Sequence, residues 1–149
     1  MLKDAGLTHI CLDLMYRLPH QGEDQLTATI ELATSLHPSR VALFGYAHVS
    51  WIKKHKRLID AAALPATEAR FEHSEAAAER LASLGYRGIG LDHFELPGDS
   101  LTNASSNRRL RRNFQGYTID PADALLGFGI SSIGKLLQGL VQNRANFRN

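Results

Sequence analysis

The stretch HICLDLMY, residues 9–16, decides the fold class of this chain. Its residues are almost all apolar, which is typical of a buried β-strand, and a polar loop follows. Because side chains alternate along a strand, Asp13 shares one face with Cys11 and Met15, and the other apolar residues share the opposite face. A carboxylate on such a strand indicates a polar partner for Asp13, either a bound ligand or a backbone amide or arginine of the protein.

The segments that follow predict a parallel sheet. Residues 23–36 carry apolar side chains at helical spacing, and RVALFGYAHV (40–49) predicts a second strand with Leu43, Gly45 and Ala47 on one face. A strand, a helix and a strand with short connections form a βαβ unit, whose two strands run parallel. The expected inner stripe of the helix consists of Leu26, Ile30, Ala33 and Leu36.

A second helix is expected over residues 67–84, with Gly85 placed to end it. The segment YRGIGLDHFEL (86–96) then predicts a third strand. The expected apolar stripe of this helix consists of Phe71, Ala78 and Leu81.

The last part of the chain is less regular. Residues 99–112 are typical of an exposed loop or a short helix. DALLGFGISSIG (123–134) contains glycines that favour close packing of the backbone. A phosphate-binding loop is the less favoured interpretation, because the third glycine and the preceding strand of that motif are missing.

The composition indicates an ordinary globular domain. The 149 residues are 44% hydrophobic and 21% charged, and the formal net charge is +2. A large nucleic-acid surface is disfavoured by this charge, and no apolar run approaches the roughly 20 residues of a membrane helix. With one cysteine, Cys11, no internal disulfide can form; since the start also lacks a signal-peptide layout, we expect a cytoplasmic protein.

The run RRLRRNFQGYT (108–118) is the main candidate for contact with an anion. Its four arginines allow three interpretations: a nucleic-acid patch, a solvated loop, or a clamp that pairs one or two guanidinium groups with carboxylates of a small substrate. None of the seven histidines has metal-ligand spacing. His48 and His93 are the better candidates, because each lies at the end of an expected strand, where sites of parallel α/β folds gather.

Five segments together resemble one family of enzymes. HICLDLMYRLPHQ, VALFGYAHV, GIGLDHFELPGD, RRNFQGYT and LLGFGISSIG are similar, in this order, to consecutive motifs of the oxygen-independent coproporphyrinogen III oxidases. These are radical S-adenosylmethionine enzymes of haem biosynthesis. The combination of NFQGYT and LDHF favours the oxidases over their haem-chaperone relatives, of which a fragment is an alternative.

The resemblance implies an α/β fold, namely the later part of a partial TIM barrel with parallel strands, intervening helices and an extension. Residues 1–149 would form a single partial domain: a βαβ unit over 1–49, a helix and a strand over 50–98, and a loop with the glycine-rich segment over 99–149. The complete enzymes hold a [4Fe–4S] cluster and two S-adenosylmethionine molecules, from which a 5′-deoxyadenosyl radical is made. Two propionates of coproporphyrinogen III thereby lose carbon dioxide and become the vinyl groups of protoporphyrinogen IX.

The resemblance also implies binding residues. Asp13 matches an aspartate that contacts S-adenosylmethionine, and Met15, Ala47 and Ile133 match apolar contacts of this cofactor. Arg112 is the candidate for pairing with a substrate carboxylate. No residue of the chain matches a catalytic group or a metal ligand of the family.

The chain departs from the family pattern at important positions. The CxxxCxxC motif, whose three thiolates hold the cluster, has no counterpart, because Cys11 is the sole cysteine. Arg17 replaces the usual glycine before Leu-Pro, which predicts a strained turn if that position needs a positive φ. We therefore expect an inactive, marginally stable fragment that oligomerises or aggregates unless it pairs with the missing half of the barrel, which a separate chain could supply. The alternative is a non-catalytic remnant that binds S-adenosylmethionine or a tetrapyrrole.

Overall fold

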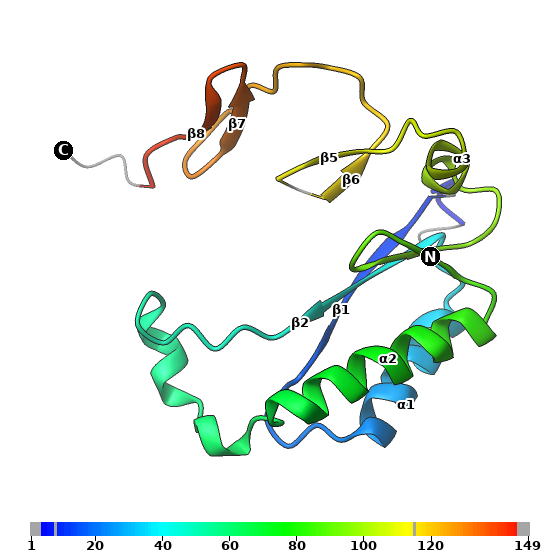
Figure 1. Cartoon of the computed structure of the whole chain (residues 1–149), viewed down its shortest axis with the longest axis vertical. Coiled ribbons are helices and arrows are strands. Elements are labelled where there is room, and N and C mark those ends of the chain that lie inside the picture. Colours follow the sequence, from blue (N-terminus) through cyan, green and yellow to red (C-terminus); the bar gives the residue numbers. More distant parts are fainter. Residues whose placement is uncertain (1–3, 8, 115, 146–149) are drawn as a thin grey trace. The chain divides into compact units, whose positions relative to one another are not determined.

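A computed structural model of the chain describes residues 4–7, 9–114 and 116–145. The chain divides into two compact units, Met1–Thr102 and Asn103–Asn149, which are described separately below. The boundary falls inside a short helix, α3 (Ser100–Ser106), which Figure 1 labels.

A four-stranded sheet forms the centre of the first unit. Strands β1 (Cys11–Tyr16) and β2 (Arg40–Gly45) run parallel, with Cys11 opposite Arg40 and Tyr16 opposite Gly45, and helix α1 (Glu23–Ser35) connects them. The predicted βαβ unit is therefore confirmed. In spatial order the strands are β1 (Cys11–Tyr16), β2 (Arg40–Gly45), β4 (His93–Glu95) and β3 (Arg87–Ile89).

The segment 86–96 differs from its prediction. A single strand was expected, but the structure contains a hairpin in which β3 and β4 are antiparallel, and β4 also runs antiparallel to β2. Gly90 adopts a φ of 66° between the two strands and so interrupts the extended chain. The prediction of one strand was wrong because the residues on both sides of Gly90 are apolar, as they would be in a continuous buried strand. Leu91 lies in the turn itself and is 83% exposed.

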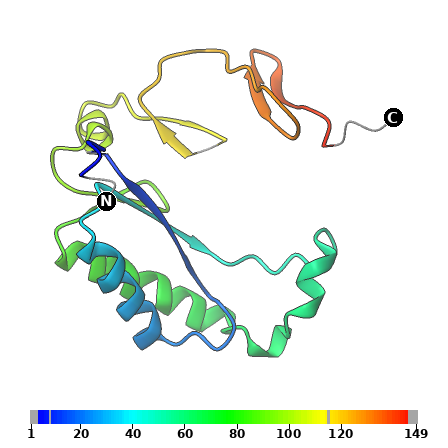
Figure 2. The ribbon, with the colours of Figure 1, turned by 180° about the vertical axis from the view of Figure 1, so that it is seen from behind.

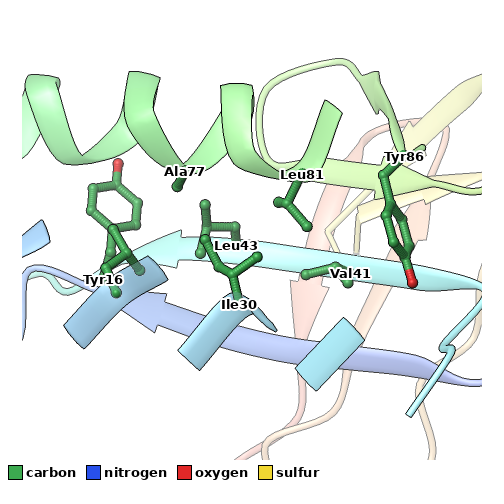
Figure 3. Packing of buried hydrophobic residues seen from close by; sticks show 8 residues of the cluster. Tyr16, Ile30, Val41, Leu43, Ala77, Leu81 and Tyr86 are labelled. Carbon is green, nitrogen blue, oxygen red and sulfur yellow. The ribbon is translucent and has the colours of Figure 1, made fainter. Parts of the chain in front are cut away.

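Helices α1 and α2 (Thr67–Ser83) cover one face of the sheet, an arrangement that Figure 2 shows from behind. Figure 3 shows Val41 and Leu43 of β2 facing Ala77 and Leu81 of α2. Burial of one large aliphatic side chain contributes roughly 2 kcal/mol, so this layer stabilises the first unit. The hydrophobic core consists of Tyr16, Leu26, Ile30, Val41, Leu43, Ala77, Leu81 and Tyr86.

The two helices lie close to their predicted ranges, but their buried stripes differ in part. Gly85 ends α2 with a φ of 90°, and its N–H donates to the carbonyl of Ala82 at 3.0 Å. Leu36 is 64% exposed because it lies beyond the last turn of α1. Phe71 is 65% exposed because the buried stripe of α2 begins at His73, about 200° further round the helix. No helix in the described part of the chain is long and apolar enough to cross a membrane.

Two short 3-10 helices, η1 (Lys54–Leu58) and η2 (Ala61–Ala63), lie between β2 and α2. The strand predicted over 40–49 ends earlier, at Gly45. The N–H of Val49 donates to the carbonyl of Ala47 at 3.1 Å, which turns the chain away from the sheet.

The second unit contains two antiparallel hairpins. They pair β5 (Arg111–Asn113) with β6 (Gly116–Thr118), and β7 (Ile133–Leu136) with β8 (Gly139–Gln142). A Cβ atom added to Gly127 would lie 2.9 Å from the Cβ of Ser132, and one added to Gly134 would lie 2.7 Å from the carbonyl oxygen of Leu125. These glycines therefore serve close backbone packing, as the sequence favoured. Helix α3 agrees with the short helix expected within residues 99–112.

Candidate functional site

The face of the sheet opposite the helices carries the polar side chain of β1. Cys11, Asp13 and Met15 are all exposed, and the residues between them are partly buried. The strand register sets Asp13 beside Ala42 of β2, and Ala42 beside His93 of β4. Residues paired in this way share a face, so Asp13, Ala42 and His93 form one row across the sheet with a small side chain at its centre.

Met15 and Phe44 form the next row towards the carboxyl ends of β1 and β2. The common face of Asp13 and Met15 agrees with the alternation expected from the sequence. Oδ1 of Asp13 lies 4.0 Å from the sulfur of Cys11, and no ion pair reaches the carboxylate within the described residues. Its oxygens can therefore accept hydrogen bonds from hydroxyl or amine groups.

His93 belongs to a pair of side chains that the sequence revealed only in part. Its Nδ1 lies 2.7 Å from Oδ1 of Asp92, and its ring packs edge-on against Phe44 with centroids 6.2 Å apart. A carboxylate at Nδ1 fixes the orientation of an imidazole ring. Sequence reasoning identified the histidine but not Asp92, although an aspartate directly before a histidine could have predicted this pair.

Ala47 lies beyond the carboxyl end of β2 and is exposed. The expectation that it continues the strand face of Gly45 was wrong, because β2 ends at Gly45 itself. That glycine lies on the helix-covered face, where an added Cβ would be 3.0 Å from the ring of Tyr16. Asp13 lies three register positions before the strand end, or about 10 Å along the strand, so Asp13 and Ala47 stand at different levels.

His48 and Arg17 lie at this same carboxyl end. Nδ1 of His48 is 3.3 Å from the hydroxyl of Tyr46. The Arg17 guanidinium donates to the carbonyls of Tyr46 and Pro65, each at 3.3 Å, and so connects the exit of β2 with the start of α2. Arg17 has a φ of 62°, which confirms that this position requires the left-handed backbone that glycine adopts more easily.

The second unit contains the other two predicted residues. Ile133, half-buried at the start of β7, lines a cavity of about 420 Å³ together with Phe114, Leu125 and Phe128. Arg112 is exposed on β5, and its guanidinium lies over the ring of Tyr117, 5.0 Å from the centroid. Nη1 of Arg112 also donates to the Tyr117 hydroxyl at 3.4 Å.

A buried ionic cluster at the amino end of β2 was not predicted. Nε and Nη2 of Arg40 donate to Oδ1 of Asp99 at 3.1 and 2.6 Å, and Nε lies 3.3 Å from Oε1 of Glu95. Burial, and then repulsion from Asp99, raises the pKa of Glu95 above its usual value. Burial also disfavours the charged form of Asp99, but hydrogen bonds from Arg40 and from the N–H of Leu101 outweigh it and lower the pKa. The cluster joins β2 to the chain after β4.

The residues present do not fit a [4Fe–4S] cluster. Such a cluster needs three thiolates in this family, and the chain has one cysteine. Partial burial of the sulfur, and then the charge of Asp13, raises the pKa of the Cys11 thiol and disfavours the thiolate. Within residues 4–7, 9–114 and 116–145, no group of three or more His, Cys, Asp or Glu side chains is placed to hold a metal ion.

The known proteins that are similar to this chain and are named below are all described as coproporphyrinogen III oxidases. No protein-family model matches the chain. "Coproporphyrinogen III oxidase, anaerobic 1" of Cereibacter sphaeroides is 49% identical over 144 residues, and "Oxygen-independent coproporphyrinogen III oxidase" of Bradyrhizobium diazoefficiens is 50% identical over 143 residues. The resemblance to these oxidases is confirmed. The matches cover 97% and 96% of this chain, but the chain spans only 32% of the length of each oxidase.

A solved structure of an oxidase has the same fold over this region. HemN from Escherichia coli, described as a coproporphyrinogen III oxidase and a radical SAM enzyme, superposes with a TM-score of 0.90 and is 35% identical. The match covers 97% of this chain and 33% of the oxidase. The α/β fold expected for part of a radical S-adenosylmethionine barrel is therefore confirmed.

Proposed function

We propose that the chain supplies part of the cofactor-binding barrel of an oxygen-independent coproporphyrinogen III oxidase. This oxidoreductase of porphyrin biosynthesis converts two propionates of coproporphyrinogen III to the vinyl groups of protoporphyrinogen IX, with release of carbon dioxide. The observation that carries the proposal is the agreement with an oxidase over 97% of the chain in both sequence and fold.

Residues on the face opposite the helices fit S-adenosylmethionine, of which the complete enzyme would hold two molecules. Asp13 presents an exposed carboxylate that can accept hydrogen bonds from ribose hydroxyls or from an amino group. Met15 on the same face and Ala47 beyond β2 would supply apolar contacts. Ile133 on β7 belongs to the second unit, and the resemblance to the oxidases is what supports it as a further apolar contact of this cofactor. When bound, S-adenosylmethionine supplies the radical chemistry that oxidises the propionate side chain.

Arg112 would orient the substrate by pairing with one of its carboxylates. Stacking over Tyr117 holds the guanidinium plane, and a planar guanidinium binds a carboxylate through two parallel hydrogen bonds. Replacement of Arg112 by alanine should therefore weaken the binding of a tetracarboxylate porphyrin, and an unchanged affinity would remove this residue from the site.

The missing half of the barrel completes the proposal. The cluster ligands would lie outside these 149 residues, because Cys11 is their sole cysteine. In the described sheet β1 is an edge strand, and a strand of another chain can add to such an edge. We accordingly expect these residues to be inactive in isolation and to work in the reducing cytoplasm together with the missing half of the barrel, which a separate chain could supply.

Calorimetric titration with S-adenosylmethionine tests the cofactor site. Asp13→Ala should weaken binding about tenfold, because a charged acceptor is removed. Glu75→Ala, which removes an exposed carboxylate from α2, is the matched control and should bind like the unchanged chain. Equal affinities for the unchanged chain and Asp13→Ala would contradict the role of Asp13, and absence of binding heat would contradict the cofactor site.

A non-catalytic protein that binds S-adenosylmethionine or a tetrapyrrole is the second candidate, and the single cysteine favours it. Mixing the chain with a separately expressed, cluster-loaded remainder of the Cereibacter sphaeroides relative discriminates between the two. Conversion of coproporphyrinogen III by the mixture would support the oxidase. Binding of both ligands without conversion would support the second candidate.

A further inference from the structure

A strongly basic segment follows the carboxyl end of β2. Residues 51–58, here called the basic segment, include Lys53, Lys54, His55, Lys56 and Arg57. No aspartate or glutamate occurs between residues 46 and 59, and the carboxylate that follows, Asp60, accepts a hydrogen bond from the N–H of Ala62 at 2.9 Å. No ion pair engages the ammonium groups of Lys53 and Lys54 within the part of the chain that the structure describes.

Apolar side chains flank these cations and are exposed. Trp51 is 71% exposed, Ile52 is 66% exposed and Leu58 is 91% exposed. A large aromatic side chain in water beside cations suits a ligand that is apolar in its body and anionic at its rim. The basic segment therefore has two features of a ligand surface, exposed aromatic area and uncompensated positive charge.

Two side chains, Lys56 and Arg57, fix the basic segment to the end of β2. Nζ of Lys56 donates to the carbonyl of Ala47 at 2.7 Å and lies 4.7 Å from the centroid of the Tyr46 ring. Nε of Arg57 donates to the carbonyl of Ser50 at 3.4 Å. The segment is thus held at the edge where Ala47 is a proposed cofactor contact, and where sites of α/β folds with parallel strands are formed.

We propose that the basic segment binds the propionate carboxylates of the tetrapyrrole substrate. Lys53 and Lys54 pair with carboxylates, while Trp51 and Ile52 contact the apolar macrocycle. This inference rests on the proposed function, since it assigns the substrate to a surface of that same site. It adds residues outside the segments that carry the resemblance to the oxidases, and it differs from the clamp at Arg112.

Coproporphyrin III, the oxidised and fluorescent tetracarboxylate macrocycle, is a suitable probe for the full chain. Trp51 is the sole tryptophan, so quenching of its emission by the bound porphyrin reports binding next to the basic segment. We expect saturable quenching that weakens as salt is raised. The tetramethyl ester of coproporphyrin III, which lacks the carboxylates, should bind much more weakly.

The Lys53→Gln/Lys54→Gln variant should weaken coproporphyrin III binding about tenfold, as expected for two exposed charge contacts. Lys56 is left unchanged because it anchors the segment. Arg87→Gln/Arg144→Gln is the matched control; it removes the same charge from two exposed positions outside both the basic segment and the run 108–118, and should change the affinity less than about twofold.

The possible results separate this inference from the proposed function. Three results would overturn the inference and leave the proposed function in place. Porphyrin binding could be unchanged in the Lys53→Gln/Lys54→Gln variant, it could leave Trp51 emission unquenched, or it could be lost in the arginine control variant instead. Absence of coproporphyrin III binding by the unchanged chain, while far-ultraviolet circular dichroism shows it folded, would overturn the tetrapyrrole site and the inference with it.

Discussion

The two faces of the central sheet use the same strands in different ways. On β1, Tyr16 is 9% exposed against the helices, and its neighbour Met15, on the opposite face, is 44% exposed. Side chains on the covered face are held by apolar packing, so a substitution there changes stability. Side chains such as Asp13 on the opposite face contribute little to packing, and a substitution there tests ligand binding. One strand thus separates the two roles residue by residue.

Truncation of a core side chain should give the largest contrast between the faces. Leu81 is fully buried, and Leu81→Ala should lower the free energy of unfolding by about 3 kcal/mol through lost burial and the cavity left behind. Met15→Ala on the opposite face should cost less than about 1 kcal/mol. Urea denaturation followed by circular dichroism measures both, and equal losses would remove the distinction between the faces.

The ionic cluster of Arg40, Glu95 and Asp99 is the exception on the face opposite the helices, because substitutions there should lower the free energy of unfolding. Asp99→Ala removes the acceptor of two Arg40 hydrogen bonds and should cost about 2 kcal/mol. Asp123→Ala is the control, since this carboxylate is 87% exposed and lies 3.8 Å from Arg111. A control variant as unstable as Asp99→Ala would show that burial does not set the strength of these pairs.

The same cluster predicts a pH dependence of stability. The pKa of Glu95 is raised in the folded state, so its contribution is fully present below the ordinary value of 4.5 and is lost as pH rises through the folded pKa. Asp99 has the opposite sign, because its lowered pKa gives a contribution that is present above 3.8 and is lost as pH falls through the folded pKa. Glu95→Gln should therefore flatten the fall in unfolding free energy above pH 4.5, and parallel pH curves for both proteins would contradict this.

The smallest expected effect concerns the turn after β1. Arg17→Ala and Arg17→Gly lose the same two guanidinium hydrogen bonds, but glycine accepts the φ of 62° without strain. The glycine variant should be the more stable by about 1 kcal/mol. At Arg87, on strand β3, the order should reverse and alanine should be the better replacement. Thermal denaturation of the four variants compares them directly.

The sequence predicted those features that depend on local periodicity. Alternation along β1 placed Asp13 and Met15 together, and the buried helix positions Leu26 and Ile30 followed from their spacing. The glycine signal for the end of α2 was also right. In each case the side chains concerned lie within one helix or strand, so the spacing of neighbouring residues in the sequence is enough to predict where they point.

Features that depend on tertiary contacts could not be predicted in this way. Arg40 and Asp99 are 59 positions apart, and no local pattern relates a half-buried strand arginine to a carboxylate after a later strand. The hairpin within 86–96 was not predicted for a different reason, because a buried strand and a short apolar turn contain the same kinds of residue. Ala47 was assigned to a strand because extended periodicity does not show where a chain leaves its sheet.

The parallel pairing of β1 with β2 has a consequence for how the chain folds. Cys11 and Arg40 meet across a separation of 29 residues, so this ladder forms only after a long loop has closed and α1 has packed. The hairpins of the second unit join neighbouring segments and can close in roughly 1–10 microseconds. Refolding of the first unit is therefore the slower event. Chains that have not completed it expose the unpaired backbone of β1, which favours aggregation of newly made protein.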